Sequence, residues 1–262
     1  MKEEQFNLTF KWIGQATWIL SIDDVKIACD PVLCPKDTVQ VYALGMKGRR
    51  MTDPAYDAQD FSDIDFWLIT HNHEDHLDKK GLEAISPRSK VITHKNAAKM
   101  LRRNSLHDVA ALNAGQKITF ERKNLSIEIE AIPAMHAKSF LITLFSGVNG
   151  YWITVRKDQA RLQIYITGDT VVHKKVIQAL SGRTADILIP FMGAAYGDRS
   201  WGPLTLNAKG LKKFVQIVEP RIILPVHFGT FSHLTEPVSA LEALNDARMK
   251  IMKEGQTLGF TL

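Results

Sequence analysis

Residues 70 to 76 read Thr-His-Asn-His-Glu-Asp-His and place three imidazoles and a carboxylate within six positions. The side chains concerned are His71, His73, Asp75 and His76. Neutral imidazole and carboxylate are the usual nitrogen and oxygen ligands of divalent metal ions. Polar side chains crowded in this way are poor material for a hydrophobic core or a helix face. The window therefore predicts a metal-binding loop, with solvated loop histidines as the alternative.

Three further polar residues each follow a segment whose pattern predicts an apolar strand: His136, Asp169 and His227. Polar side chains at the ends of several strands are expected when one edge of a sheet builds a site. Taken singly, a histidine after a strand can lie at the surface, and Asp169 can cap the helix that follows it. Together, and in order behind the histidine window, the three residues favour a shared metal site.

The composition is that of an ordinary soluble globular protein, with 45% hydrophobic and 23% charged residues in 262. This length allows one large α/β domain or two small ones. No segment approaches the ~18 continuous apolar residues of a membrane span. The polar N-terminus predicts no secretory signal. We therefore expect a cytoplasmic protein.

The net charge of +5 is mild, and basic residues do not cluster as extended nucleic-acid binding requires. It is compatible with an anionic small-molecule substrate. The two cysteines, Cys29 and Cys34, have a spacing that matches no zinc pair. Histidine, aspartate and glutamate must therefore carry any metal.

Strand patterns dominate the early part of the chain, and helices alternate with strands in the last third. Strands are predicted at 6–13, 17–22, 25–29, 66–70, 91–93, within 117–156, and at 161–167, 187–190 and 222–225. Helices are predicted at 79–85, 96–104, 172–180, 206–218 and 237–245. Residues 36–62 are predicted to be polar and irregular. The pattern indicates two sheets packed face to face with helices outside.

With these residues in place, the chain resembles the metallo-β-lactamase-fold superfamily of metal-dependent hydrolases. The resemblance covers nearly the whole chain, from Asp30-Pro31 through the histidine window to His227. The motifs Trp12-Ile-Gly-Gln-Ala-Thr17 and Ala28-Cys-Asp-Pro31 resemble a narrower branch. That branch includes L-ascorbate-6-phosphate lactonase and N-acyl-phosphatidylethanolamine-hydrolysing phospholipase D. Gln15 stands where many relatives carry histidine, outside the ligand set.

The resemblance implies a single domain over residues 1–262, an αβ/βα four-layer sandwich of two facing mixed β-sheets with helices outside. It implies two metal sites, the first held by His71, His73 and His136 and the second by Asp75, His76 and His227, with Asp169 bridging both. Asp75 is also implied as the catalytic residue. Asp30 is expected to fix a ligand imidazole through its free ring nitrogen, with a turn or helix cap as the alternative.

Seven nitrogen and oxygen ligands without a thiolate suit two divalent ions, Zn²⁺, Mn²⁺ or Fe²⁺, and do not select among them. Two such ions about 3.5–4 Å apart can bind a bridging hydroxide and polarise the bond that it attacks. We therefore expect a hydrolase of an ester or lactone bond in a small phosphorylated or carboxylated metabolite. The alternatives are a phosphodiesterase of the phospholipase D or cyclic-nucleotide type, and a non-catalytic metal-binding sensor or scaffold. A homo-oligomer is left open, and no specific nucleic-acid partner is expected.

Two segments, 36–62 and 191–205, join strands that carry site residues and should rim the pocket. Arginine in a cleft suits bidentate contact with phosphate or carboxylate. The candidate substrate-binding residues are Arg49, Arg50, Tyr196, Arg199 and Trp201. A solvated basic loop is the alternative for residues 47–50. Among the other histidines, His94 and His233 neighbour strand ends and are candidates for the pocket.

Overall fold

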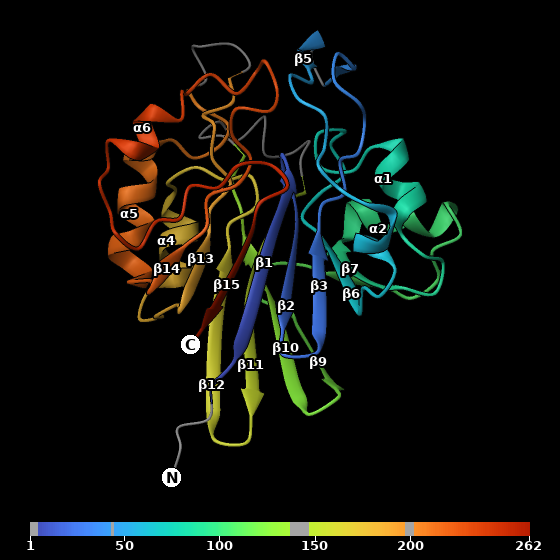
Figure 1. Cartoon of the computed structure of the whole chain (residues 1–262), viewed down its shortest axis with the longest axis vertical. Helices are drawn as coiled ribbons and strands as arrows, with labels where there is room; N and C mark the ends of the chain where they lie inside the picture. The colour runs from blue at the N-terminus through green and yellow to red at the C-terminus, as the bar shows by residue number, and fades with distance from the viewer. Residues whose placement is uncertain (1–4, 43–44, 137–146, 197–201) are drawn as a thin grey trace.

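Two β-sheets that pack face to face, with helices on their outer sides, form the framework of the protein (Figure 1). The structure is a computed structural model and describes residues 5–42, 45–136, 147–196 and 202–262. Within these residues, one buried core contains side chains from both sheets. The expected sandwich of two mixed sheets with helices outside is confirmed.

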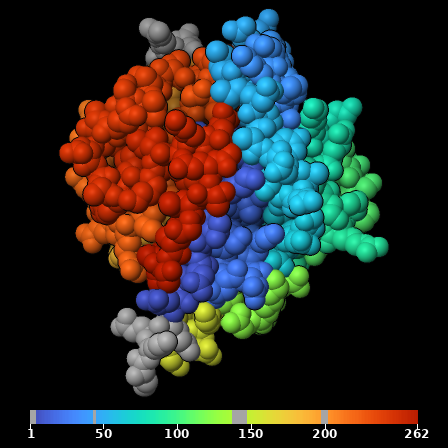
Figure 2. Space-filling view, in the orientation of Figure 1, coloured from blue at the N-terminus to red at the C-terminus, as the bar shows by residue number. Residues whose placement is uncertain are grey.

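The larger sheet has seven strands, in the order β15 (Thr257–Thr261), β1 (Asn7–Gly14), β2 (Thr17–Ile22), β3 (Val25–Cys29), β6 (Phe66–Ile69), β7 (Lys90–His94) and β8 (Val109–Leu112). The smaller sheet has six, in the order β14 (Ile222–Ile223), β13 (Ile187–Ile189), β12 (Ala160–Ile166), β11 (Asn149–Lys157), β10 (Leu125–Pro133) and β9 (Lys117–Arg122). Strands β3, β6, β7 and β8 run parallel to one another, and so do β12, β13 and β14. The C-terminal β15 pairs with β1, and Figure 2 shows the C-terminal segment lying against the N-terminal strands.

Helices cover both outer faces. On one side of the molecule in Figure 1 lie α1 (Lys79–Ala84) and α2 (Lys95–Arg103), and on the other lie α4 (Lys174–Leu180), α5 (Ala208–Val218) and the short α6 (Ser239–Glu242). Asn207 begins α5, because its side-chain oxygen accepts a hydrogen bond from the backbone N–H of Gly210. In the part of the chain that the structure describes, no helix has the length and apolar character needed to cross a bilayer.

The strand β6 illustrates how the sequence builds the layers. All four of its residues are buried, which is typical of a parallel strand covered on both faces. Successive side chains point to opposite faces. Phe66 and Leu68 accordingly join the core between the sheets, whereas Trp67 and Ile69 join the layer beneath α1 and α2. The apolar residues on both faces of β6 therefore end where the segment with the histidines begins.

The structure adds elements that the sequence analysis does not predict. Residues 36–62 contain a hairpin of β4 (Val39–Val41) and β5 (Lys47–Arg49), followed by the 3₁₀ helix η2 (Ala58–Phe61). Three-residue strands are too short for an alternating pattern to stand out from a polar segment. The edge strand β15 is also unpredicted, because its five residues contain only two apolar side chains, Leu258 and Phe260. Each of these elements lies at an edge or rim of the sheets.

Polar contacts tie the two sheets together where the histidine window begins. The hydroxyl of Tyr151, on β11, donates a hydrogen bond of 2.9 Å to the carbonyl oxygen of Ile69 on β6. The backbone N–H of Asn149 donates a 3.1 Å bond to the carbonyl oxygen of Thr70. These bonds fix the start of the window relative to the smaller sheet.

Replacing Tyr151 with Phe removes one of these bonds, so we expect the free energy of unfolding to fall by about 1 kcal/mol. Tyr165 provides a matched control, because its hydroxyl is buried in the same sheet and has no hydrogen-bond partner among the described residues. Tyr165→Phe should therefore leave stability unchanged or raise it. Urea unfolding of both variants measures the difference, and equal losses would contradict the role given to Tyr151.

Candidate metal centre

All the candidate ligands lie where strands of the two sheets end at one edge of the sandwich. The histidine window follows β6 in the larger sheet. In the smaller sheet, His136 follows β10, Asp169 follows β12 and His227 follows the short β14. The loops after these strands gather at the upper end of the molecule in Figure 1. Segments far apart in the sequence thereby face one another across the inter-sheet core.

Three imidazoles form the first group of ligand atoms. Nε2 of His71 lies 3.0 Å from Nδ1 of His73, and Nε2 of His136 lies 3.2 Å from the same atom. Nitrogen atoms bound to one tetrahedral zinc ion are about 3.3 Å apart, since each Zn–N bond is about 2.0–2.1 Å long. The observed spacing fits three rings that face a single ion.

Asp75, His76 and His227 form a second group, whose ligand atoms lie within 4.8 Å of one another. The Asp169 carboxylate lies between the two groups. Its Oδ2 is 3.1 Å from Nε2 of His76 and 3.6 Å from Nε2 of His136. Its Oδ1 is 3.6 Å from Nε2 of His227. A single carboxylate thus faces ligands of both groups.

Buried atoms of these groups lack hydrogen-bond partners among the described residues. They are Nε2 of His76, Nε2 of His227 and Oδ1 of Asp169. A buried polar atom without a partner costs about 1–3 kcal/mol. Divalent ions would satisfy these atoms, because imidazole nitrogen and carboxylate oxygen are the ligands that such ions take in proteins. The residues therefore fit metal ions at both groups.

Asp30, at the end of β3, fixes two of the ligand rings. Its Oδ2 accepts hydrogen bonds from Nδ1 of His76 at 2.8 Å and from the Thr70 hydroxyl at 2.6 Å. Because that hydroxyl donates its proton to Asp30, its oxygen accepts from Nδ1 of His71 at 3.0 Å. Both rings thus carry a proton on Nδ1 and present the lone pair of Nε2 to the site. The sequence analysis overlooks Thr70, although its hydroxyl directly precedes the window.

Backbone carbonyls orient two further rings. Nδ1 of His136 donates to the carbonyl oxygen of Leu204 at 2.9 Å, and Nδ1 of His227 donates to that of Met192 at 3.1 Å. A carbonyl oxygen only accepts, so each ring carries its proton on Nδ1 and turns Nε2 toward the ligand groups. These carbonyl partners leave no side-chain signal in a sequence.

Gln15 supports His227 through its backbone. Its carbonyl oxygen accepts a 2.9 Å hydrogen bond from the backbone N–H of His227, and its side-chain oxygen accepts from the Thr230 hydroxyl. Gln15 and His227 both adopt the left-handed region, with φ of 52° and 62°. Non-glycine residues enter this region at a cost, so the contacts of this loop hold His227 in place.

The Asp169 and Asp75 carboxylates outweigh burial at His76 and His227 and raise the pKa of both rings. At the other two imidazoles of the window, burial dominates and favours the neutral, metal-binding form. It lowers the pKa of His71, and together with a neighbouring imidazole it lowers the pKa of His73 to about 4. Burial alone would raise the pKa of Asp169, but His227 and His76 outweigh it and hold that pKa below its usual range. Neutral imidazole and ionised carboxylate are the forms that bind metal.

Arg50 does not serve the pocket that the sequence analysis assigns to it. Its side chain is fully buried, and its guanidinium donates 3.0 Å hydrogen bonds to the carbonyl oxygens of Val32 and Thr52. The same group lies over the ring of Phe231 and 3.6 Å from the carboxylate of Glu254. Arg50 therefore supports the loops behind the site, which corrects the expectation that it binds substrate.

The other candidate substrate contacts fall in three places. Arg49 is 56% exposed at its side chain and lies 3.8 Å from the Asp37 carboxylate. It alternates along β5 with the buried Gly48, so it points away from the inner face of the hairpin. Tyr196 is half-buried at the rim. Arg199 and Trp201 lie outside the described residues.

The two additional histidine candidates differ in position. His94 accepts a hydrogen bond from the backbone N–H of Asn96 and caps the start of α2. His233 reaches the site, because its Nε2 lies 3.1 Å from Oδ2 of Asp75.

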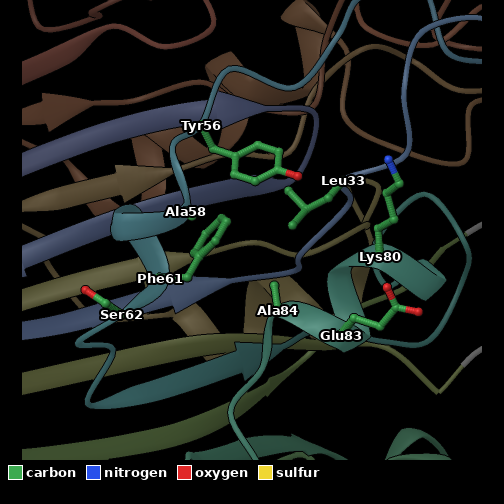
Figure 3. Close-up of a pocket in the computed structure, with 8 residues that line it drawn as sticks. All are labelled: Leu33, Tyr56, Ala58, Phe61, Ser62, Lys80, Glu83 and Ala84. Carbon is green, nitrogen blue, oxygen red and sulfur yellow. The ribbon is translucent and has the colours of Figure 1, made fainter.

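A separate hollow of about 420 Å³ opens between α1 and the segment around η2 (Figure 3). In the close-up, Leu33, Tyr56 and Phe61 approach it from one side, while Lys80 and Glu83 on α1 approach it from the other. Its lining includes none of the candidate metal ligands. We therefore place the chemistry at the strand ends and not in this hollow.

Known proteins resemble the chain over most of its length. The model of the beta-lactamase superfamily domain matches residues 9–227. N-acyl-phosphatidylethanolamine-hydrolyzing phospholipase D 1 of Caenorhabditis elegans is 26% identical, over 90% of this chain and 69% of that protein. A metal-dependent hydrolase of Pyrococcus furiosus is 26% identical, over 76% of this chain and 83% of that protein. The structure of isothiocyanate hydrolase from Delia radicum gut bacteria matches with a TM-score of 0.79 at 21% identity, over 96% and 98% of the two chains, and supports the fold.

The contacts of Asp30 lead to a prediction about metal affinity. Asparagine at this position would place an NH₂ group opposite a hydrogen-bond donor, where the carboxylate now accepts. The His71 and His76 rings would then lose the carboxylate that orients both of them. We expect Asp30→Asn to weaken Zn²⁺ binding by roughly 10–100-fold. Competition with a chromophoric chelator measures the affinity. The exposed Asp37→Asn is the control, and equal affinities for the two variants would contradict the role of Asp30.

Proposed function

Because the chain belongs to the beta-lactamase superfamily and is a metal-dependent hydrolase, we propose that it uses two divalent metal ions to hydrolyse a phosphodiester bond in a small molecule. The observation that carries the proposal is the position of Asp169 between two groups of three ligands. A carboxylate that lies within 3.6 Å of ligand nitrogens in both groups suits a pair of ions better than a single one.

The geometry supports one ligand set for each of the proposed ions. The first ion would be held by His71, His73 and His136, and the second by Asp75, His76 and His227, with Asp169 shared. When bound, two such ions lower the pKa of water and stabilise charge on the attacking and leaving oxygens of a displacement. Zn²⁺, Mn²⁺ and Fe²⁺ all accept this donor set.

Asp75 is the proposed catalytic residue among the ligands. Burial alone would raise its pKa, but the neighbouring His76, His227 and His233 outweigh burial and hold that pKa well below its usual range. The carboxylate is therefore ionised at neutral pH. It can accept a hydrogen bond from the attacking water and direct the lone pair of that water toward the substrate.

The charge of the site favours an anionic substrate without an arginine. The buried carboxylates of Asp30, Asp75 and Asp169 carry fewer negative charges than two divalent ions carry positive ones. The neutral histidines add none. As long as the bound water keeps its proton, the loaded site is therefore net positive and attracts an anion such as a phosphodiester. This argument replaces the one from Arg49 and Arg50.

The relatives support the phosphodiester over the ester or lactone. The Caenorhabditis elegans relative is named for hydrolysis of N-acyl-phosphatidylethanolamine by a phospholipase D. An ester or lactone of an anionic metabolite is the competing class, since the same ions would polarise a carbonyl oxygen. A cytoplasmic location remains part of the proposal.

A substrate panel tests the proposal on protein loaded with Zn²⁺ or Mn²⁺. It contains bis(p-nitrophenyl) phosphate, N-acyl-phosphatidylethanolamine, lactones and carboxylic esters. We expect turnover of the phosphodiesters, and a fall in kcat of roughly 10²–10³-fold in Asp75→Asn, which loses a ligand and a hydrogen-bond acceptor. Asp24→Asn, in the exposed turn after β2, is the control and should match the wild type.

The other outcomes of the panel each discard a defined part of the proposal. Turnover of lactones or esters alone would replace the substrate class and keep the two-ion site. A fully loaded protein that turns over no member of the panel would favour a metal-binding sensor or scaffold.

A further inference from the structure

A histidine outside the two ligand groups contacts one of their carboxylates. His233 lies six positions after His227, and its side chain is 12% exposed. Its Nε2 is 3.1 Å from Oδ2 of Asp75. Among the described residues, the groups of ligand atoms that face a common point do not include His233. The contact therefore reaches the site through Asp75.

The partners of His233 define which ring nitrogen carries the proton. An ionised carboxylate only accepts hydrogen bonds, so Nε2 of His233 is the donor to Asp75. Nδ1 is then an acceptor, and it is buried without a partner among the described residues. Leaving a ring nitrogen in this state costs free energy. A histidine that served only stability would not need to leave Nδ1 unpaired. The contact between Nε2 and Asp75 is therefore what determines the position of the His233 ring.

The hairpin of β4 and β5 packs against the His233 ring. Gly48 faces the ring: a Cβ at that position would come within 2.8 Å of the Tyr42 hydroxyl and closer still to Nδ1 of His233. Tyr42 meets the ring edge-on, with centroids 5.1 Å apart. Glycine is therefore needed for the hairpin to approach this closely.

Hydrogen bonds hold the hairpin on both sides of the contact. On one side, the backbone N–H and C=O of Arg49 bond to the Oγ and the backbone N–H of Ser232, at 3.0 and 2.9 Å. On the other side, Tyr42 donates to Oε1 of Gln40, and Nε2 of Gln40 donates to the carbonyl oxygen of Glu74, both at 2.8 Å. The hairpin thus binds the neighbours of both His233 and Asp75 in the chain.

We propose that His233 is a positioning residue of the second metal site, where the hairpin holds it so that its Nε2–H fixes the direction of the Asp75 carboxylate. The inference rests on the proposed two-ion site and adds a residue to it. Hydrogen bonds to ligating carboxylates typically affect metal affinity by about 10–100-fold. Fixing Asp75 should therefore raise the affinity for the metal ion at the second site and leave the affinity for the other ion unchanged.

Calorimetric titration of the metal-free protein with Zn²⁺ tests the proposal. His233→Phe keeps a ring of similar shape and removes the donor. One of two Zn²⁺ equivalents should bind roughly 10–100-fold more weakly, while the other keeps wild-type affinity. His233→Gln keeps an N–H near the position of Nε2 and should restore affinity to within about threefold. His107→Phe, at an exposed histidine, is the matched control and should change neither equivalent.

Gly48→Ala provides an independent variant in which His233 itself is intact. Its methyl group displaces the ring from Asp75, so the same equivalent should weaken. In the His233→Ala background that ring is absent, and Gly48→Ala should then cause little further loss of affinity. Additive losses would show that the hairpin acts on the site by a route other than His233.

The outcomes separate this inference from the proposed function. A wild-type protein that binds a single equivalent would overturn the two-ion site itself. Two equivalents with unchanged affinities in His233→Phe would overturn the role of His233 alone. Visible spectra of the Co²⁺-loaded proteins distinguish positioning from ligation. At saturation with Co²⁺, His233→Phe should keep the wild-type band pattern. A change in the bands that indicates one fewer nitrogen ligand would instead show that His233 binds the metal directly.

Discussion

The buried carboxylate of Asp30 is the interaction on which the site depends most. It is fully buried at the end of β3 and accepts from the backbone N–H of Thr70, from the Thr70 hydroxyl and from Nδ1 of His76. Burial raises the pKa of this carboxyl, and the donors from His76 and Thr70 oppose that rise. Through Thr70 it also reaches His71, so one anion sets the orientation of a ring in each proposed ligand set.

The fold divides the remaining work between two sheets. The larger sheet supplies the histidine window after β6, and the smaller sheet supplies His136, Asp169 and His227 after three of its strands. Neither sheet alone supplies all three ligands of either group, so the site forms only when the two sheets pack together. The apolar core between them and the Tyr151 bond to β6 therefore define the distance between the two halves.

The sequence predicts those parts of the site whose signal lies in side-chain types and long apolar runs. The four-layer sandwich follows from strands such as β6, and the candidate ligands follow from polar side chains at strand ends. The hairpin of β4 and β5 is missed, because three residues carry no measurable period. Arg50 is misplaced, since a buried guanidinium that binds backbone carbonyls looks like any basic loop residue. The carbonyl partners from Leu204 and Met192 have no sequence signal at all.

Anomalous diffraction from crystals loaded with Zn²⁺ tests the central claim, a pair of ions at the strand ends, most directly. The account predicts two peaks per chain, each about 2.0–2.2 Å from its ligand atoms. The first should lie among His71 Nε2, His73 Nδ1 and His136 Nε2, and the second among Asp75, His76 Nε2 and His227 Nε2. Asp169 should contact both. A single peak, or two peaks without a shared Asp169, would contradict the account.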